Sequence, residues 1–292
     1  MYDIDILKSG LQKYVRRNMP TKALFCLRDL LIHAEKARRI TTWKSILSRI
    51  VIIANEDISI GDVSTVAHVM KVVSTIKSNI FPGVKIAWKE LSPLIVMMCE
   101  AEKTREFAHI YYALYAKGTE PDIDFKTCLI NKDIRSIQWF RFLSEKNTCS
   151  EHSTCIEQHR PCCAQDCLDI LERYQVNNDE LAELYLVSKC LIGSIKENIW
   201  IFGLLFLMYL NNINTYKEKT LVVDDEPWTD MSEWIVDDFV IDKHTKLGLC
   251  PGAAELLLGR LNGKTLKDFV HEGAISKFTT REYKELHDKL YG

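Results

Sequence analysis

A segment in the middle of the chain concentrates thiol and imidazole side chains. Thiolates and neutral imidazoles at short spacings can close a tetrahedral zinc site. No quartet here has the spacing of a zinc finger or knuckle, so a Cys-rich surface loop without metal and a set of disulfides remain alternatives. The candidate metal ligands are Cys149, Cys155, His159, Cys162, Cys163 and Cys167, with His152 lying among them.

A second group of residue types suited to chemistry lies near the C-terminus. Asp238, Asp242, Lys243 and His244 could supply acid–base groups to a DNA-processing enzyme. Asp242 and His244 are two positions apart, which places them on different faces of a helix and disfavours a direct Asp–His couple. This pattern leaves the question of enzyme activity open and favours a non-enzymatic role.

Cations gather in the first part of the chain although the net charge of the whole chain is only −2. Such an imbalance predicts a basic face that could contact DNA. An acidic stretch at 224–238, interleaved with Trp228 and Trp234, is expected to be a solvated loop or a docking strip for a basic partner, including the basic face of a neighbouring copy. The candidate DNA-binding residues are Lys13, Arg16, Arg17, Lys22, Arg38, Arg39, Lys243 and Lys246.

The stretch 46–62 is the element most able to position these groups. Its apolar residues recur at the spacing of one wide helix face, so we expect a buried helix. Asn55, Glu56 and Asp57 interrupt that helix, and Asp62 is placed to cap the next one. The stretch is expected to be a helix–turn–helix packing unit. The alternative is a carboxylate pair that contacts a partner or an ion.

The remaining pattern is also helical. The chain holds only 12 Gly and 7 Pro, which favours an all-α or predominantly α fold. We predict three domains: 1–117, 118–220 with a Cys/His-rich loop at 147–167, and 221–292 with an acidic segment and C-terminal helices. Thr21, Thr41 or Thr42, and Asn178 or Asp179 are the expected helix caps. Expected helices cover residues 4–18, 21–33, 63–78, 84–101, 104–117, 130–143, 168–171, 181–195 and 199–210.

The first 115 residues carry a family resemblance. The residues that carry it are the runs 7–17 and 49–58, together with Pro20, the run 22–24, Leu27 and the pair 30–31. This order resembles the helical C-terminal region of the MgsA/RarA replication-fork maintenance ATPases, which are relatives of clamp loaders. The motif residues of the turn are Arg49, Asn55, Glu56 and Asp57. The resemblance implies a clamp-loader-collar-like helical bundle that mediates oligomerisation.

The sequence departs from that family in having no Gly-x-x-x-x-Gly-Lys-Ser/Thr phosphate loop. The resemblance therefore implies a scaffold without ATPase activity. We expect a non-catalytic, oligomerising accessory factor in DNA replication, recombination or repair, with DNA and a separate ATPase or replication protein as partners. The alternatives are the DNA-processing enzyme above and a zinc-stabilised structural protein. No cofactor is expected apart from zinc.

Three further patterns bear on the cellular compartment and on whether the chain crosses a membrane. The apolar run 199–210 is too short to cross a bilayer and is expected to be a buried helix. The opening Met1–Asp5 lacks the basic start and apolar core of a secretory signal. Cys26, Cys99, Cys128 and Cys190 lie in apolar helical patterns, which is typical of free thiols in a reducing compartment. We therefore expect a cytoplasmic or nuclear protein.

Overall fold

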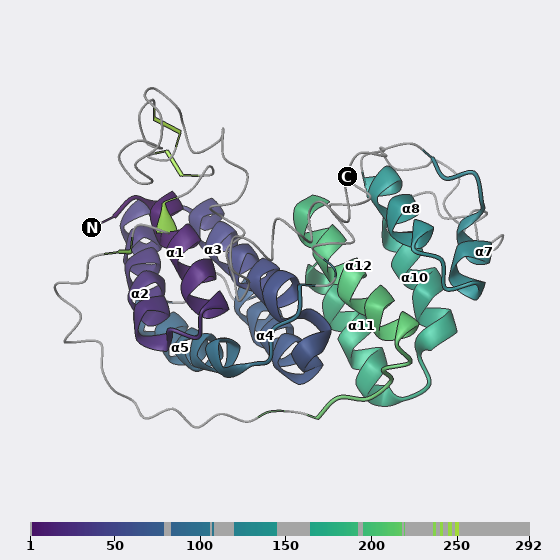
Figure 1. Ribbon diagram of the computed structural model, residues 1–292. Helices are drawn as coiled ribbons and strands as arrows, with labels where there is room; N and C mark the ends of the chain where they lie inside the picture. Colours follow the sequence, from purple (N-terminus) through teal and green to yellow (C-terminus); the bar gives the residue numbers. More distant parts are fainter. Residues whose placement is uncertain are drawn as a thin grey trace. The chain divides into compact units, whose positions relative to one another are not determined.

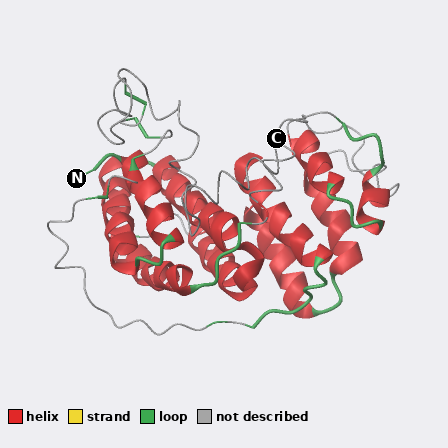
Figure 2. Cartoon of the chain, in the orientation of Figure 1, coloured by secondary structure: helices red, strands yellow, loops and turns green. Residues whose placement is uncertain are grey.

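The fold is known from a computed structural model, and every regular element among the described residues is a helix (Figures 1 and 2). No strand occurs in that part of the chain, so the predicted all-α class is confirmed. The described residues are 2–78, 83–105, 107, 120–144, 164–191, 195–217, 219, 236–237, 240–241, 245–246 and 249–250.

The chain divides into two compact units. The first comprises residues 1–49, 79–100 and 221–292, and the second comprises residues 50–78 and 101–220. The division falls inside one helix, α3 (Ile40–Ile53), so both units contain a part of it. The predicted domain boundaries after residues 117 and 220 lie outside the described residues and stay predictions.

The first unit is a helical bundle. Its main elements are α1 (Ile4–Arg16), α2 (Pro20–Ala37) and α5 (Val84–Glu100), and each of these helices packs on the other two. The core positions recur every three or four residues, which places them on one face of each helix. Five fully buried leucines lie at its centre: Leu7, Leu11, Leu27, Leu30 and Leu31.

The second unit is built around α12 (Ile195–Leu210), which corresponds to the longest apolar run of the sequence. This helix packs on three others, and Phe202 of α12 stacks on Phe140 with a centroid distance of 4.2 Å. Its apolar residues from Ile199 to Met208 are buried, as predicted for this run, whereas Leu210 is only half-buried. No helix in the described part of the chain is long and apolar enough to cross a membrane. The surrounding helices are α4 (Val63–Ser78), α7 (Phe125–Ile130), α8 (Arg135–Ser144), α10 (Ala164–Gln175) and α11 (Asp179–Leu191).

Several predicted helix ends are wrong. Helix α2 begins at Pro20 after Met19, without a side-chain cap, because proline is suited to the first helical position. Helix α3 begins at Ile40, before either of the threonines expected to cap it.

The helix predicted at 130–143 begins later, at Arg135, because a turn at 131–134 separates α8 from α7, which ends at Ile130. Residues 102–105 are not helical either, so the helix expected to begin at residue 104 does not begin there. The predicted cap Asn178 is confirmed, since its Oδ1 accepts a hydrogen bond from the amide of Leu181 at 2.9 Å.

Candidate functional site

The motif turn that follows α3 is a π-helical turn, η1 (Ala54–Ile58), which leads into a 3₁₀ turn, η2 (Ser59–Asp62), and then into α4. The Asn55 amide side chain donates to the carbonyl of Val51 at 2.8 Å, and the Ser59 amide donates to the carbonyl of Ala54. Ser59 has a φ of 51°, a conformation that is costly for a residue with a side chain. Single π turns inside helices occur often at functional sites.

The carboxylates of the turn point inward rather than to solvent. Asp57 is completely buried, and Glu56 is 13% exposed. Arg105 lies against both, with its Nη2 3.4 Å from Glu56 Oε1 and its Nε 3.7 Å from Asp57 Oδ1. A buried carboxylate needs such a cation, because burial of an unpaired charge costs several kcal/mol. This geometry makes Asp57 a structural ion-pair partner and withdraws it from solvent.

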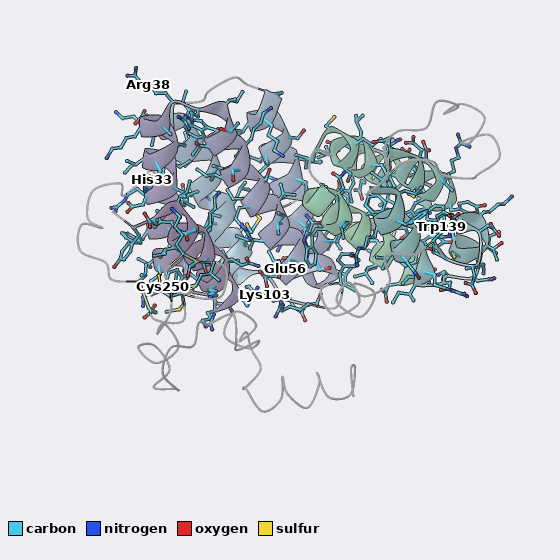
Figure 3. All side chains as sticks on the ribbon, turned by 90° about the horizontal axis from the view of Figure 1, so that it is seen from above. His33, Arg38, Glu56, Lys103, Trp139 and Cys250 are labelled. Atoms are coloured by element: carbon cyan, nitrogen blue, oxygen red, sulfur yellow. The ribbon has the colours of Figure 1, made fainter. Side chains whose placement is uncertain are left out.

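The segment that carries Arg105 is fixed to the turn by its backbone. The Thr104 amide donates to the carbonyl of Ile58 at 3.3 Å. Gly61 allows this close approach, since a Cβ there would lie 2.8 Å from the carbonyl oxygen of Glu102. The turn is therefore a packed junction of backbone from two parts of the second unit. Figure 3 labels Glu56 of the turn and Lys103 of the adjoining segment.

Two side-chain oxygens inside the junction make no hydrogen bond within the described residues. They are Asn55 Oδ1 and Ser59 Oγ, and both residues are fully buried. Arg49, the other motif residue, donates from Nη1 to Gln12 Oε1 of α1 at 3.3 Å. The four motif residues thus do not form one site: three line the turn and the fourth contacts α1.

Asp62 ends the turn and begins α4, as the sequence predicts. Its Oδ1 accepts from the Thr65 amide at 3.0 Å, and its Oδ2 accepts from the Thr65 hydroxyl at 2.8 Å. Lys219 forms an ion pair with the same carboxylate. Partial burial alone would raise the pKa of Asp62, but the bonds from Lys219 and Thr65 outweigh it and lower this pKa below its usual value.

The cations predicted to bind DNA fall into two groups. Lys13 and Arg16 are buried, and Lys22 forms an ion pair with Asp237 at 2.6 Å. Arg17 is half-buried and donates to the carbonyl of Lys13 at 3.4 Å. Lys243 lies outside the described residues, whereas Lys246 is exposed.

The second group, Arg38 and Arg39, lies in an exposed basic corner where α2 ends and α3 begins, together with two lysines that are not predicted to bind DNA. Arg38 ends α2 in the left-handed conformation, with a φ of 48°, and Arg39 follows it directly. Arg38 projects away from the ribbon (Figure 3). We name this surface the basic corner, and its residues are the exposed cations Lys36, Arg38, Arg39 and Lys44.

Five of the six candidate zinc ligands, Cys149, Cys155, His159, Cys162 and Cys163, lie outside the described residues, as do Asp238, Asp242 and His244. Cys167 is described and is fully buried in α10. No group of three or more potential ligands is placed to hold a metal ion within the described ranges. Cys26, Cys99 and Cys128 are buried as their patterns indicate, but Cys190 is exposed on α11.

Sequence reasoning missed Arg105 and Asp237. Arg105 pairs with Glu56 across a separation of 49 positions, and no local pattern indicates such a pair. Asp237 lies in the acidic stretch, but its partner Lys22 is 215 positions away. Comparisons with protein-family models, with curated proteins and with solved structures gave no match.

Proposed function

We propose that this chain is a non-catalytic, oligomerising scaffold or accessory factor in DNA replication, recombination or repair. The resemblance of the first 115 residues to the helical region of replication-fork ATPases motivates the proposal. In this account a separate ATPase or replication protein supplies the nucleotide chemistry.

One observation carries the proposal: the motif turn is a buried junction whose carboxylate Asp57 faces Arg105. A group that is fully buried and faces a cation is poorly placed to abstract a proton from a substrate or to bind an ion from solution. The role of the turn is then to fix a bend between two helices. This is the contribution expected from a motif that serves assembly rather than catalysis.

The basic corner is the surface that best supports DNA contact. Its cations are exposed, whereas Lys13 and Arg16 are buried and Lys22 is ion-paired. Phosphates bind such a cluster without reading sequence, and the counterions that they release make the affinity fall steeply with salt. The proposed mode of binding is therefore weak in sequence preference and strong in salt dependence.

Charge reversal at the corner tests this part of the proposal. The variant Arg38→Glu with Arg39→Glu should bind a labelled DNA duplex at least about 10-fold more weakly, and its salt slope should fall by about one unit for each phosphate that is no longer neutralised. The matched control is Lys85→Glu with Lys89→Glu, which reverses two exposed cations of α5. Fluorescence anisotropy between 50 and 200 mM salt, a range over which phosphate binding weakens by orders of magnitude, gives both quantities. An equal weakening in both variants, or salt-independent binding, would refute the assignment.

A further inference from the structure

The described part of the C-terminal segment lies on the face formed by α1 and the start of α2. We name residues 236–246 the strap. At one end of the strap, the Val236 amide donates to the Tyr2 hydroxyl at 3.1 Å and the Asp237 amide donates to the Tyr14 hydroxyl at 3.0 Å. Further along, the carbonyl of Val240 accepts from Ser9 Oγ at 2.6 Å and from Lys13 Nζ at 3.2 Å. Side chains of the first unit thus bind the main chain of the strap, as in many peptide-binding sites.

Two side chains of the strap add specificity. Asp237 pairs with Lys22 at 2.6 Å, and Val240 is completely buried. Gly10 leaves room for this valine, since a Cβ on Gly10 would lie 3.3 Å from Val240 Cγ1 and 2.8 Å from Cys26 Sγ. Val236 is buried as well. The face therefore selects a short segment of the form Val-Asp-x-x-Val.

The strap is held compactly enough to act as a separate ligand. The Val240 amide donates to the Asp237 carbonyl at 2.9 Å, which closes a turn between the acidic and apolar anchors. At the far end, the Lys246 amide donates to Asp5 Oδ2 at 2.6 Å. The partners of the described strap residues in these hydrogen bonds and in the ion pair all lie between Tyr2 and Lys22, so the face formed by α1 and the start of α2 supplies all of these contacts.

We propose that this face is a peptide-binding site and that a second copy of the chain can supply the strap, so that copies pair by exchanging straps. The strap makes the same contacts whether it belongs to the same chain or to a second copy, so no contact is lost when two copies exchange straps. The chain between Lys219 and Val236 can span at most ~60 Å. Whether a strap binds its own chain or a second copy depends on the effective concentration of the strap within one chain compared with the concentration of other copies. The first fifty residues are basic and the stretch 224–238 is acidic, so their opposite charges favour this contact between copies as much as within one chain.

This inference rests on the oligomerising part of the proposed function and specifies the surface that is used. Charge reversal of the Lys22–Asp237 pair tests it in the full-length protein. Lys22→Glu alone and Asp237→Lys alone each place like charges together within one chain. When the two variants are mixed, exchange places Lys at position 237 of one copy against Glu at position 22 of the other. It also places Asp237 of the second copy against Lys22 of the first, so both contacts again join opposite charges. The double variant K22E/D237K restores the pair within one chain.

The two single variants, carrying different affinity tags, are mixed and the complexes are captured and counted by native mass spectrometry. We expect mixed dimers in at least about 10-fold excess over same-variant dimers, and the double variant should behave like the unmodified chain. Lys85→Glu, an exposed cation of α5 in the same unit, is the matched control and should not favour mixed dimers. Mixed dimers no more abundant than same-variant dimers would overturn strap exchange.

A peptide experiment covers the case in which the variants fold poorly. A labelled peptide of residues 233–246 with Asp237→Lys should bind the K22E chain at least about 10-fold more tightly than the unmodified chain. The unmodified peptide should show the opposite preference. An absence of preference overturns the assignment of the face. If exchange fails while the unmodified chain still forms a defined oligomer, the proposed function survives and only this surface is wrong.

Discussion

At the scale of single residues, Asp57 and Arg105 form an ion pair that is largely withdrawn from water, and such burial of charge is costly. Asp57 has no exposure to solvent, and Arg105 Nε is 3.7 Å from its carboxylate. Replacing both charges by neutral groups of similar volume is often tolerated, whereas removal of one partner leaves a buried charge uncompensated. The pair therefore fixes the turn mainly because any conformation that separates Arg105 from Asp57 would leave a buried charge without a partner.

Arg105→Gln should lower the free energy of unfolding by about 3–5 kcal/mol, because Asp57 would remain buried without its cation. Denaturation in urea measures the change. Arg49→Gln is the control, since Arg49 is half-buried and its replacement removes a hydrogen bond of 3.3 Å to Gln12, worth about 1 kcal/mol. Adding Asp57→Asn to Arg105→Gln should recover part of the stability. A double variant less stable than Arg105→Gln alone would show that the ion pair is not the source.

The N-cap of α4 gives a second prediction at this scale. Asp62→Ala should cost about 0.5–2 kcal/mol, the usual effect of removing a capping side chain. The pKa of Asp62 is lowered in the folded protein, so its carboxylate contributes stability above the unfolded pKa of ~3.9 and loses that contribution as the pH falls through the folded pKa.

Asp62→Asn retains a capping oxygen but cannot titrate, so its unfolding free energy should fall less than that of the unmodified chain below pH ~4. Thermal unfolding at a series of pH values compares the two proteins. If the unfolding free energies of Asp62→Asn and of the unmodified chain fall equally as the pH is lowered, the assigned role of the Asp62 carboxylate is wrong.

Local residue patterns predict the cap but cannot predict the ion pair. Asp62 and Thr65 are three positions apart, and the capping preference of Asp before an apolar helix is a local property. Glu56 and Arg105 are 49 positions apart, and the second unit alone brings them together. The interruption of the apolar run at Asn55 is evident in the sequence, but nothing in it specifies a π turn, because the turn depends on Arg105 and on the backbone of Thr104.

At the scale of elements, helix ends differ in how clearly they are encoded. Asn18, Lys132 and Asn212 each end a helix with positive φ, followed by an amide that donates five residues back. Asparagine favours this conformation, so the break after α1 is predictable. Lysine gives no such signal, and for that reason the sequence predicts a helix from residue 130 where the structure has a turn at Lys132 and begins α8 only at Arg135.

Gly203 of α12 gives a prediction about helix packing. A Cβ at this position would overlap the ring of Phe107, which is fully buried and packs edge-on against Trp200. Gly203→Ala should therefore destabilise the protein by about 1–3 kcal/mol, as is usual for overpacking.

Gly83→Ala is the matched control for this variant, because a Cβ at Gly83 meets nothing within 4 Å. Its unfolding free energy should stay within about 0.5 kcal/mol of the unmodified value. In a Phe107→Leu background the cost of Gly203→Ala should shrink, since the ring atoms that it meets are gone. A cost that is the same in both backgrounds would show that another contact is responsible.

At the scale of the whole molecule, the sequence predicts the class of the fold but not the placement of the strap. Acidic and basic stretches are both evident in the sequence, and a docking strip for the basic face is one reading of the acidic stretch. The contacts of the strap lie 215–241 positions apart, so no local pattern indicates which cations it engages. Lys13 and Lys22 therefore look like free cations in the sequence although both contact the strap.

The proposed function also belongs to this scale, because it concerns assembly and a partner of the whole chain. Sedimentation of the full-length protein with an equimolar labelled duplex, at 50 and at 200 mM salt, tests it most directly. We predict a defined oligomer that carries the duplex at 50 mM salt, binds it much more weakly at 200 mM salt and leaves its strands intact. A monomer that takes up no DNA at 50 mM salt, or a duplex whose strands are cut, would contradict it.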